Sequence, residues 1–265
     1  MNGPLRQPTM FIPHGGGPCF FMPDPAGHWT GMEAFLRALP ATLPERPKAI
    51  LLVSGHWETH GFAFTGAAQP KLVYDYYGFP QHTYELRYDV PGDPDLAARA
   101  AALLQEAGIP ARVDPARGLD HGVFVPMKVA FPDADIPIVE MSVEKDLDPA
   151  LHLAAGRALA ALRDEGVLIL ASGMSFHNMR GYGDPRFTAP SDAFDQWLAH
   201  AAQSAPDERA PLLTRWEDAP AGRLSHPREE HLLPLMVAAG ASQQPGQQIY
   251  SEHVLETAIS GFAFP

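Results

Sequence analysis

Histidine is frequent in this chain, and several histidines stand just after an apolar run. The 265 residues contain 12 histidines, which are spread along the chain rather than clustered as a tag. Three of them come within a few residues of the end of an apolar run: His14, His56 and His177. Neutral imidazole is a good ligand for zinc and iron(II), and its pKa of about 6.5 lets it accept protons near neutral pH. These residues predict metal binding, proton transfer or both.

The elements that precede these histidines are predicted strands. Short apolar runs indicate buried strands at Met10–Pro13, Ala49–Ser54, Ile136–Val143 and Val167–Ser172. In an open α/β sheet, ligands bind beyond the carboxyl ends of the strands. If these strands are parallel, the three histidines converge on one rim of the sheet. The neighbouring glycines favour this arrangement, because glycine permits tight turns and close backbone approach.

Helical patterns separate the predicted strands. They cover Thr30–Leu39, Pro94–Ala107, Pro149–Glu165, Ser191–Ser204 and Pro227–Ala239. Strands alternating with helices predict an α/β fold with a mainly parallel central sheet flanked by helices on both faces. We expect a single domain over residues 1–265. Shorter alternating runs predict additional antiparallel or edge strands at Phe62–Gly66, Tyr84–Tyr88 and, as a pair, Gln248–Phe264.

The bulk composition limits the classes of function. The formal net charge is −12 and the pI is about 5.4, which argues against a general affinity for nucleic acid or anionic membrane. No stretch approaches the roughly 18 apolar residues of a membrane span, and we expect no signal peptide. The single cysteine, Cys19, excludes an intramolecular disulfide and thiolate metal sites, so we expect a reducing, cytoplasmic location. Its apolar neighbours favour a buried structural thiol over a nucleophile.

The segment Asp120-His121-Gly122 is a further candidate for the rim. It precedes an apolar, helix-like run, Val123–Ala130, and an acid before a histidine can orient the imidazole. Taken alone, any one of these histidines is equally explained as a core or loop residue with satisfied hydrogen bonds. The convergence of several on one rim favours a site.

A late segment, Ser225–His231, offers another histidine. Ser225 or His226 is the predicted N-cap of a helix, with proline as its first residue, so that His231 falls in the second turn and faces inward. Glu229 and Glu230 are expected to be charges at the positive end of that helix.

Other histidines and aromatic residues carry weaker signals. His152 and His200 lie within predicted helices and are expected to be surface groups. A cluster of aromatic residues could wall a ring-shaped pocket or belong to the core: Tyr74, Tyr76, Tyr77 and Phe79. The sequence contains no HExxH pair, GxSxG elbow or P-loop.

Five motifs together resemble a known family. FIPHGGGP, VSGHWE, LDHGVFVPM, ASGMSFHNM and HPREEHLLPLMVAAGA stand in the order found in class III extradiol ring-cleavage dioxygenases. The chain is most similar to the 4,5-DOPA extradiol dioxygenase-like subgroup, and the resemblance covers nearly its whole length. HGGGP replaces the HGSP common in the subgroup, and HPREEH replaces a threonine-proline pair before the acid and histidine. These departures leave the ligands in place and the substrate open.

The resemblance implies a single α/β domain and a non-haem metal, one ion per chain. That metal is normally iron(II), and some bacterial members carry zinc. The implied reaction cleaves a catechol ring next to its two hydroxyls with O₂, so a DOPA-like or related catechol and O₂ are the expected partners. Nucleic acid and membrane are not expected partners, and self-association is left open.

The resemblance also implies roles for individual residues. His14 and His56 correspond to metal ligands, and His231 to a third ligand from the late segment. Glu230 is the fallback, because a glutamate fills that role in other branches. His177 corresponds to a position that either completes the metal site or acts as acid or base beside it. His121 corresponds to a catalytic histidine behind the metal.

The residue types alone are also compatible with two functions other than that of a dioxygenase. In a zinc hydrolase the same histidines would hold a metal that activates water, and a catalytically silent protein could bind metal on the same fold. In a dioxygenase, a catechol must lose protons to bind a metal through both oxygens. We therefore expect either His177 or His121 to accept a proton and the other to donate one later.

Overall fold

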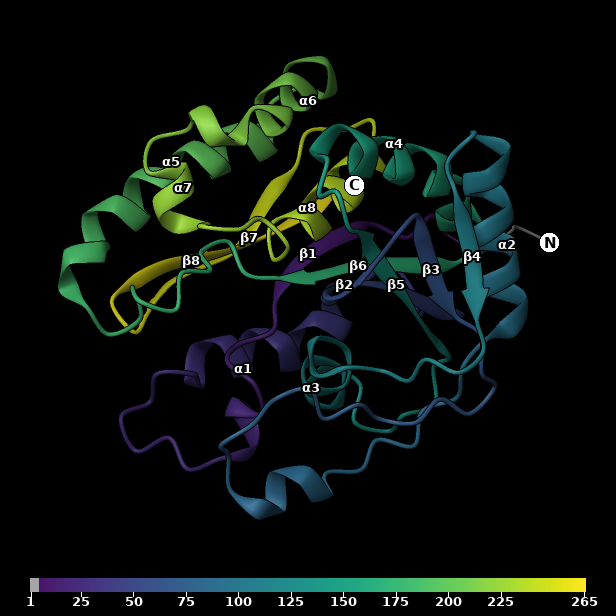
Figure 1. Ribbon diagram of the computed structural model, residues 1–265, viewed down its shortest axis with the longest axis horizontal. Coiled ribbons are helices and arrows are strands. Elements are labelled where there is room, and N and C mark those ends of the chain that lie inside the picture. The colour runs from purple at the N-terminus through teal and green to yellow at the C-terminus, as the bar shows by residue number, and fades with distance from the viewer. Residues whose placement is uncertain (1–4) are drawn as a thin grey trace.

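A mixed β-sheet forms the centre of the fold. The computed structural model describes residues 5–265, and within them the strands form one eight-stranded sheet in the order β4-β3-β5-β2-β6-β1-β8-β7 (Figure 1). The strands are β1 (Thr9–Pro13), β2 (Ala49–Thr59), β3 (Phe62–Thr65), β4 (Ala111–Asp114), β5 (Ile138–Glu144), β6 (Val167–Gly173), β7 (Gln247–Val254) and β8 (Thr257–Phe264). The four central strands β5, β2, β6 and β1 are parallel, whereas β3 and β8 run antiparallel to their inner neighbours.

Helices cover both faces of this sheet, which confirms the predicted fold class. The α-helices are α1 (Thr30–Ala38), α2 (Pro94–Glu106), α3 (His121–Ala130), α4 (Pro149–Leu159), α5 (Thr188–Gln203), α6 (Pro206–Thr214), α7 (Gly222–Ser225) and α8 (Leu233–Gly240). Short 3₁₀ helices are η1 (Cys19–Phe21), η2 (Leu39–Thr42), η3 (Gln81–Glu85), η4 (Ala160–Glu165), η5 (Pro185–Phe187) and η6 (Trp216–Asp218). In Figure 1, α2, α4 and α8 lie on one side of the central strands, and α1 and α3 on the other. None of the described helices is long and apolar enough to cross a bilayer.

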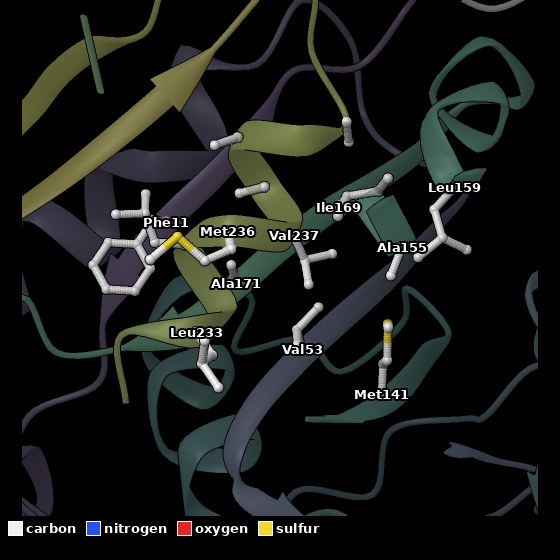
Figure 2. Packing of buried hydrophobic residues seen from close by; sticks show 14 of the residues in the cluster. Phe11, Val53, Met141, Ala155, Leu159, Ile169, Ala171, Leu233, Met236 and Val237 are labelled. Atoms are coloured by element: carbon white, nitrogen blue, oxygen red, sulfur yellow. The ribbon is translucent and has the colours of Figure 1, made fainter. Parts of the chain in front are cut away.

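Alternation along the central strands fills both hydrophobic cores. In β2, Leu51 and Val53 pack toward α2, α4 and α8, whereas Ile50 and Leu52 pack toward α1 and α3. Because both faces of the parallel strands are buried, these strands appear in the sequence as continuous apolar runs. Figure 2 shows the first core, where strand residues meet the apolar sides of α4 and α8: Val53, Ile169, Ala171, Ala155, Leu159, Met236 and Val237.

One predicted strand is absent from the structure, and one observed strand was not predicted. The predicted strand at Tyr84–Tyr88 is wrong, because the chain forms η3 over Gln81–Glu85 instead. There the Thr83 N–H and hydroxyl both donate to the Pro80 carbonyl, at 3.0 and 2.8 Å, which closes a turn. The short strand β4 was not predicted. The predicted pair over Gln248–Phe264 is confirmed as the β7–β8 hairpin.

Two predicted helices are shorter than expected. The pattern at Pro149–Glu165 gives α4 and then η4, and the pattern at Pro227–Ala239 gives only α8 from Leu233 onward. The expected surface position of His152 is also wrong, because its side chain is fully buried. Its Nε2 accepts from the Glu144 N–H at 3.1 Å, and its Nδ1–H donates to the Asp148 carbonyl at 2.7 Å. A histidine that satisfies two backbone groups can occupy a core.

Candidate metal centre and active site

The predicted convergence of strand ends is present. Strand β6 lies between β1 and β2, and all three run in the same direction. The His14 N–H donates to the Gly173 carbonyl at 3.3 Å, which ties the end of β1 to the end of β6. His56 lies within β2 rather than after it, where the pairing with β5 shifts register between Ser54 and Glu58. Such an irregularity re-aims a side chain, and here it turns His56 into the site.

Two glycines let a late segment cross the ends of these strands. A Cβ on Gly173 would collide with the His231 carbonyl oxygen, and a Cβ on Gly55 would lie 2.6 Å from the Glu230 carbonyl oxygen. The Met174 N–H donates to the His231 carbonyl at 3.1 Å. The residues before α8 therefore lie on the strand ends, and this close backbone approach requires glycine.

The same contacts correct the predicted helix start around His231. Ser225 is the last residue of α7 and His226 is its C-cap, so neither is an N-cap. His231 comes two residues before α8 instead of in a second helical turn. Its carbonyl bonds to Met174 rather than within a helix, which is why the helix begins later. Glu230 is likewise not a helix-terminal charge, because its carboxylate binds histidines.

Five histidines gather here, and each has its Nδ1 next to an acceptor oxygen. His14 Nδ1 is 2.9 Å from the Gly15 carbonyl oxygen. The Asp75 carboxylate oxygens lie 2.8 Å from Nδ1 of His121 and 3.5 Å from Nδ1 of His56. Glu230 Oε1 lies 2.9 Å from Nδ1 of His231 and 3.2 Å from Nδ1 of His177. Carbonyl and carboxylate oxygens only accept hydrogen bonds, so they favour the proton on Nδ1 and leave the Nε2 lone pairs free.

Three of these Nε2 atoms fit a common metal ion. His14 Nε2 is buried and has no hydrogen-bond partner, and His56 Nε2 lies 3.1 Å from His231 Nε2. The ring centroids of these three histidines are 5.0, 5.2 and 4.6 Å apart. Imidazole rings bound to one ion at tetrahedral or octahedral angles have centroids roughly 4.6–5.3 Å apart. The donor set therefore fits a divalent metal such as zinc or iron(II).

The other two histidines stand closer to a single neighbour each. The His177 ring stacks on His231 at 3.5 Å with an interplanar angle of 18°. The His121 ring lies 3.9 Å from His56, although ring nitrogens of His14, His56 and His121 are all within 4.8 Å of one another. Two parallel stacked rings direct their nitrogens side by side rather than toward one point. This geometry favours the acid–base alternative for His177.

Burial keeps the three candidate ligands neutral. It lowers the pKa of His14 and of His231 well below the usual value, and it lowers the pKa of His56 to about 4. Burial alone would raise the pKa of Asp75, but hydrogen bonds and charge from His121 and His56 lower it overall. The pKa of Glu230 is lowered in the same way by His177 and Arg228. Neutral imidazoles backed by ionised carboxylates suit metal binding.

A second, fully buried pair of carboxyl groups supports the site from behind. Asp120 accepts from the Ser54 hydroxyl at 2.8 Å and from Arg117 Nη2 at 2.9 Å. The Asp120 N–H donates to Glu140 at 3.0 Å, and burial together with Asp120 raises the pKa of the Glu140 carboxyl. Asp120 therefore does not orient the neighbouring His121, and Asp75 does so instead. Asp120 instead ties the start of α3 to β2.

A cavity of about 450 Å³ opens above the histidines. This volume lies within the range of roughly 300–1,000 Å³ typical of small-molecule sites. All five histidines line it, and so do the predicted aromatic residues Tyr76, Tyr77 and Phe79. Tyr74 does not line it, because its ring packs behind Tyr76 and its hydroxyl donates to the Leu86 carbonyl at 2.5 Å.

Sequence reasoning missed two functional residues of this site. Asp75 lies between Tyr74 and Tyr76 in an aromatic run, and its only signal was an acid among rings. Trp29, which lines the cavity before α1, had no signal. Cys19 is buried as expected, and burial raises the pKa of its thiol to about 12, so it is not a nucleophile.

The known proteins that are similar to this chain include aromatic ring-opening dioxygenases. The model of the family described as the catalytic LigB subunit of aromatic ring-opening dioxygenase matches residues 9–263. A dioxygenase, tasH, of Hapsidospora irregularis is 43% identical and shares 89% of this chain and 78% of its own. A 4,5-DOPA dioxygenase extradiol of Escherichia coli (strain K12) is 39% identical, over 91% of this chain and 88% of its own. The crystal structure of an uncharacterized protein from Escherichia coli K12 superposes with a TM-score of 0.76 at 31% identity, covering 98% and 100% of the two chains.

Proposed function

This chain belongs to the family of the catalytic LigB subunit of aromatic ring-opening dioxygenases. From that membership we propose which of its histidines bind the metal and which transfer protons. The chain is a metal-dependent enzyme that cleaves the ring of a catechol with O₂. His14, His56 and His231 hold one iron(II) ion through their Nε2 atoms. His121 and His177 move protons, and Asp75 and Glu230 orient them.

The free Nε2 atoms carry this assignment of ligands. His14 Nε2 is buried without a partner, and the 3.1 Å separation between His56 and His231 Nε2 suits two ligands of one ion. The stack of His177 on His231 supports an acid–base role for His177. Glu230, the fallback ligand, already bridges two histidines through Oε1, which supports an orienting role.

Iron(II) is proposed over zinc because the reaction involves O₂. When bound, iron supplies a redox-active centre that holds the catechol oxygens and O₂ next to each other, whereas zinc has no accessible second oxidation state. The residues bind either ion, since neutral imidazole suits both. The metal that supports turnover therefore has to be measured.

His121 and His177 lie on opposite sides of the proposed ligands. His121 is adjacent to His56, and His177 is adjacent to His231. One of the two accepts at Nε2 a proton from a catechol hydroxyl, and the other returns a proton as the ring opens. Asp75 and Glu230 stabilise the imidazolium that forms on each. Both histidines line the cavity, so they reach the substrate directly.

The reaction balances without an external reductant. The carbon–carbon bond beside the two hydroxyl-bearing carbons breaks, and both atoms of O₂ enter the product. The ring is oxidised to one carboxylate and one carbonyl group as O₂ is reduced. The product therefore contains all the atoms of the catechol and of O₂, apart from the proton that the carboxylate releases.

Oxygen uptake by metal-loaded protein tests this function. The metal-free protein is loaded with iron(II) under argon, mixed with a panel of catechols and then exposed to O₂. We expect one O₂ consumed per catechol and a product heavier by two oxygen atoms, with zinc-loaded protein inactive. Resorcinol, whose hydroxyls are not adjacent, is the matched control and should not react. Uptake without product, or equal turnover with zinc, would contradict the proposal.

The compartment is proposed from the single cysteine. Cys19 is the only cysteine of the chain and is buried, so the fold does not depend on an intramolecular disulfide. This supports a reducing compartment such as the cytoplasm. Fractionation of expressing cells, with activity assayed in each fraction, tests the location.

A further inference from the structure

The cavity above the histidines has a polar floor and an apolar wall. The floor consists of the five histidine rings and the backbone of Gly15, Gly16 and Gly17. The wall includes Trp29, Tyr76, Phe79, Met174, Tyr182 and Leu255. Among the described residues, 5–265, no lysine, arginine, aspartate or glutamate lines the cavity. Arg180 follows a lining residue in sequence but is exposed and does not line the cavity.

The hydroxyl groups of the two inner tyrosines are already engaged. The Tyr76 hydroxyl donates to the Thr83 carbonyl at 2.5 Å, and the Tyr182 hydroxyl donates to the Phe176 carbonyl at 2.7 Å. Both tyrosines therefore present ring carbons to the cavity rather than free donors. The carboxylates of Asp75 and Glu230 stand behind the histidines and would repel an anion.

The outer end of the cavity is apolar as well. Tyr77 and Met179 line it and are 91% and 72% exposed. Only two other large apolar side chains of the described residues are exposed, and both are less so: Leu5 at 55% and Leu224 at 43%. Large apolar side chains that are exposed to solvent at the end of a cavity indicate a surface that an apolar ligand covers.

We propose that the enzyme selects catechols whose ring substituent is uncharged and apolar, and that it discriminates against carboxylate and zwitterionic substituents. This inference rests on the proposed function, because the histidine floor must hold the catechol hydroxyls. The substituent then lies along the apolar wall, where an alkyl chain leaves water favourably. A carboxylate in the same place loses its hydration and finds no cation.

Binding to iron(II)-loaded protein under argon tests the selectivity without turnover. The matched probes are 4-(3-methylbutyl)catechol and 3-(3,4-dihydroxyphenyl)propionate, which have the same branching and differ in charge. DOPA is the zwitterionic probe and unsubstituted catechol the reference. We expect calorimetry to show the alkyl probe binding at least about tenfold more tightly than the propionate and DOPA.

The outcomes separate the two proposals. Propionate or DOPA binding as tightly as the alkyl probe, with catechol also bound, overturns the selectivity and leaves the proposed function standing. Failure of unsubstituted catechol to bind contradicts the proposed function, and the selectivity fails with it.

A cation placed on the wall provides a second test. Met179→Lys should shift the ratio of the two dissociation constants toward the propionate by about tenfold, because the ammonium pairs with the carboxylate. Leu5→Lys is the matched control, since it makes the same change on an exposed residue outside the cavity. An unchanged ratio in Met179→Lys, or an equal shift in both variants, contradicts the placement of the substituent.

Discussion

Each of two carboxylates serves a pair of histidines in this site, one proposed ligand and one proposed acid or base. Asp75 serves His56 and His121, and Glu230 serves His231 and His177. In the proposed assignment, each carboxylate favours the Nδ1–H tautomer of one ligand and supports positive charge on one proton-transferring histidine. The proposed assignment therefore couples metal binding to proton transfer through two individual residues.

Replacing Asp75 tests this coupling. We expect Asp75→Asn to lower metal affinity or turnover about 10–100-fold, because an amide no longer requires the proton on Nδ1. The pH profile of kcat should also change, since an imidazolium on His121 loses its counter-charge, and Asp75→Glu should restore part of the activity. Asp133→Asn, an exposed site with the same change in charge, is the control. An unaltered pH profile would limit Asp75 to a structural role.

The acid–base assignment is tested at His121. We expect His121→Ala to retain metal and to lose turnover by roughly 10²–10⁴-fold, because the substrate proton has no acceptor at that position. Metal content is measured by mass spectrometry and turnover by oxygen uptake. His14→Ala is the matched comparison and should lose the metal itself. Unchanged turnover in His121→Ala would refute the role.

At the scale of elements, the sequence indicated the strands that carry His14, His56 and His177 because buried parallel strands are continuous apolar runs. It also indicated the glycines at their ends. It did not show that His231 precedes a helix, since proline and two acids are typical of a helix start. The deciding contact joins His231 to Met174, which is distant in sequence. Asp75 was missed for the same reason, because its partners come from other elements.

The crossing of the late segment over β6 depends on Gly173. We expect Gly173→Ala to abolish metal binding, because its methyl group would collide with the His231 carbonyl and the Phe11 ring. Gly16→Ala, on the same rim, is the matched control. A Cβ there meets Trp29 at an ordinary 3.4 Å, so metal should be retained. Metal content and circular dichroism distinguish site loss from unfolding, and full metal content in Gly173→Ala would contradict this account.

At the scale of the whole molecule, the strand order creates the site. Strand β6 is inserted between β1 and β2, so the strands that carry His14 and His56 are not neighbours. β6 ends in glycine, and the segment before α8 passes over that end and brings His231 next to the other two. Residues from distant parts of the chain therefore meet at one edge of the sheet. This explains why no short motif encodes the full set of proposed ligands.

Buried neutral histidines also make the stability of the whole molecule depend on pH. Burial lowers the pKa of His152 to about 4 in the folded chain, against about 6.5 when unfolded. Above pH 6.5 both states are neutral there and His152 has no effect on the pH dependence. Between about pH 6.5 and 4, only the unfolded state binds the proton. The free energy of unfolding therefore falls, as the pH decreases, by up to about 1.4 kcal/mol per pH unit.

A variant without this titration isolates the contribution. His152→Gln keeps an acceptor for the Glu144 N–H but cannot be protonated. We expect it to be less stable than the parent by about 1–2 kcal/mol at pH 7.5, because it loses the contact of the ring with Phe62. Between pH 6.5 and 4.5, its free energy of unfolding should fall less steeply as the pH decreases. The difference in slope should be up to about 1.4 kcal/mol per pH unit, which corresponds to one proton. Urea unfolding of both metal-free proteins across this range measures the difference, and identical slopes would show that His152 is protonated in the folded state.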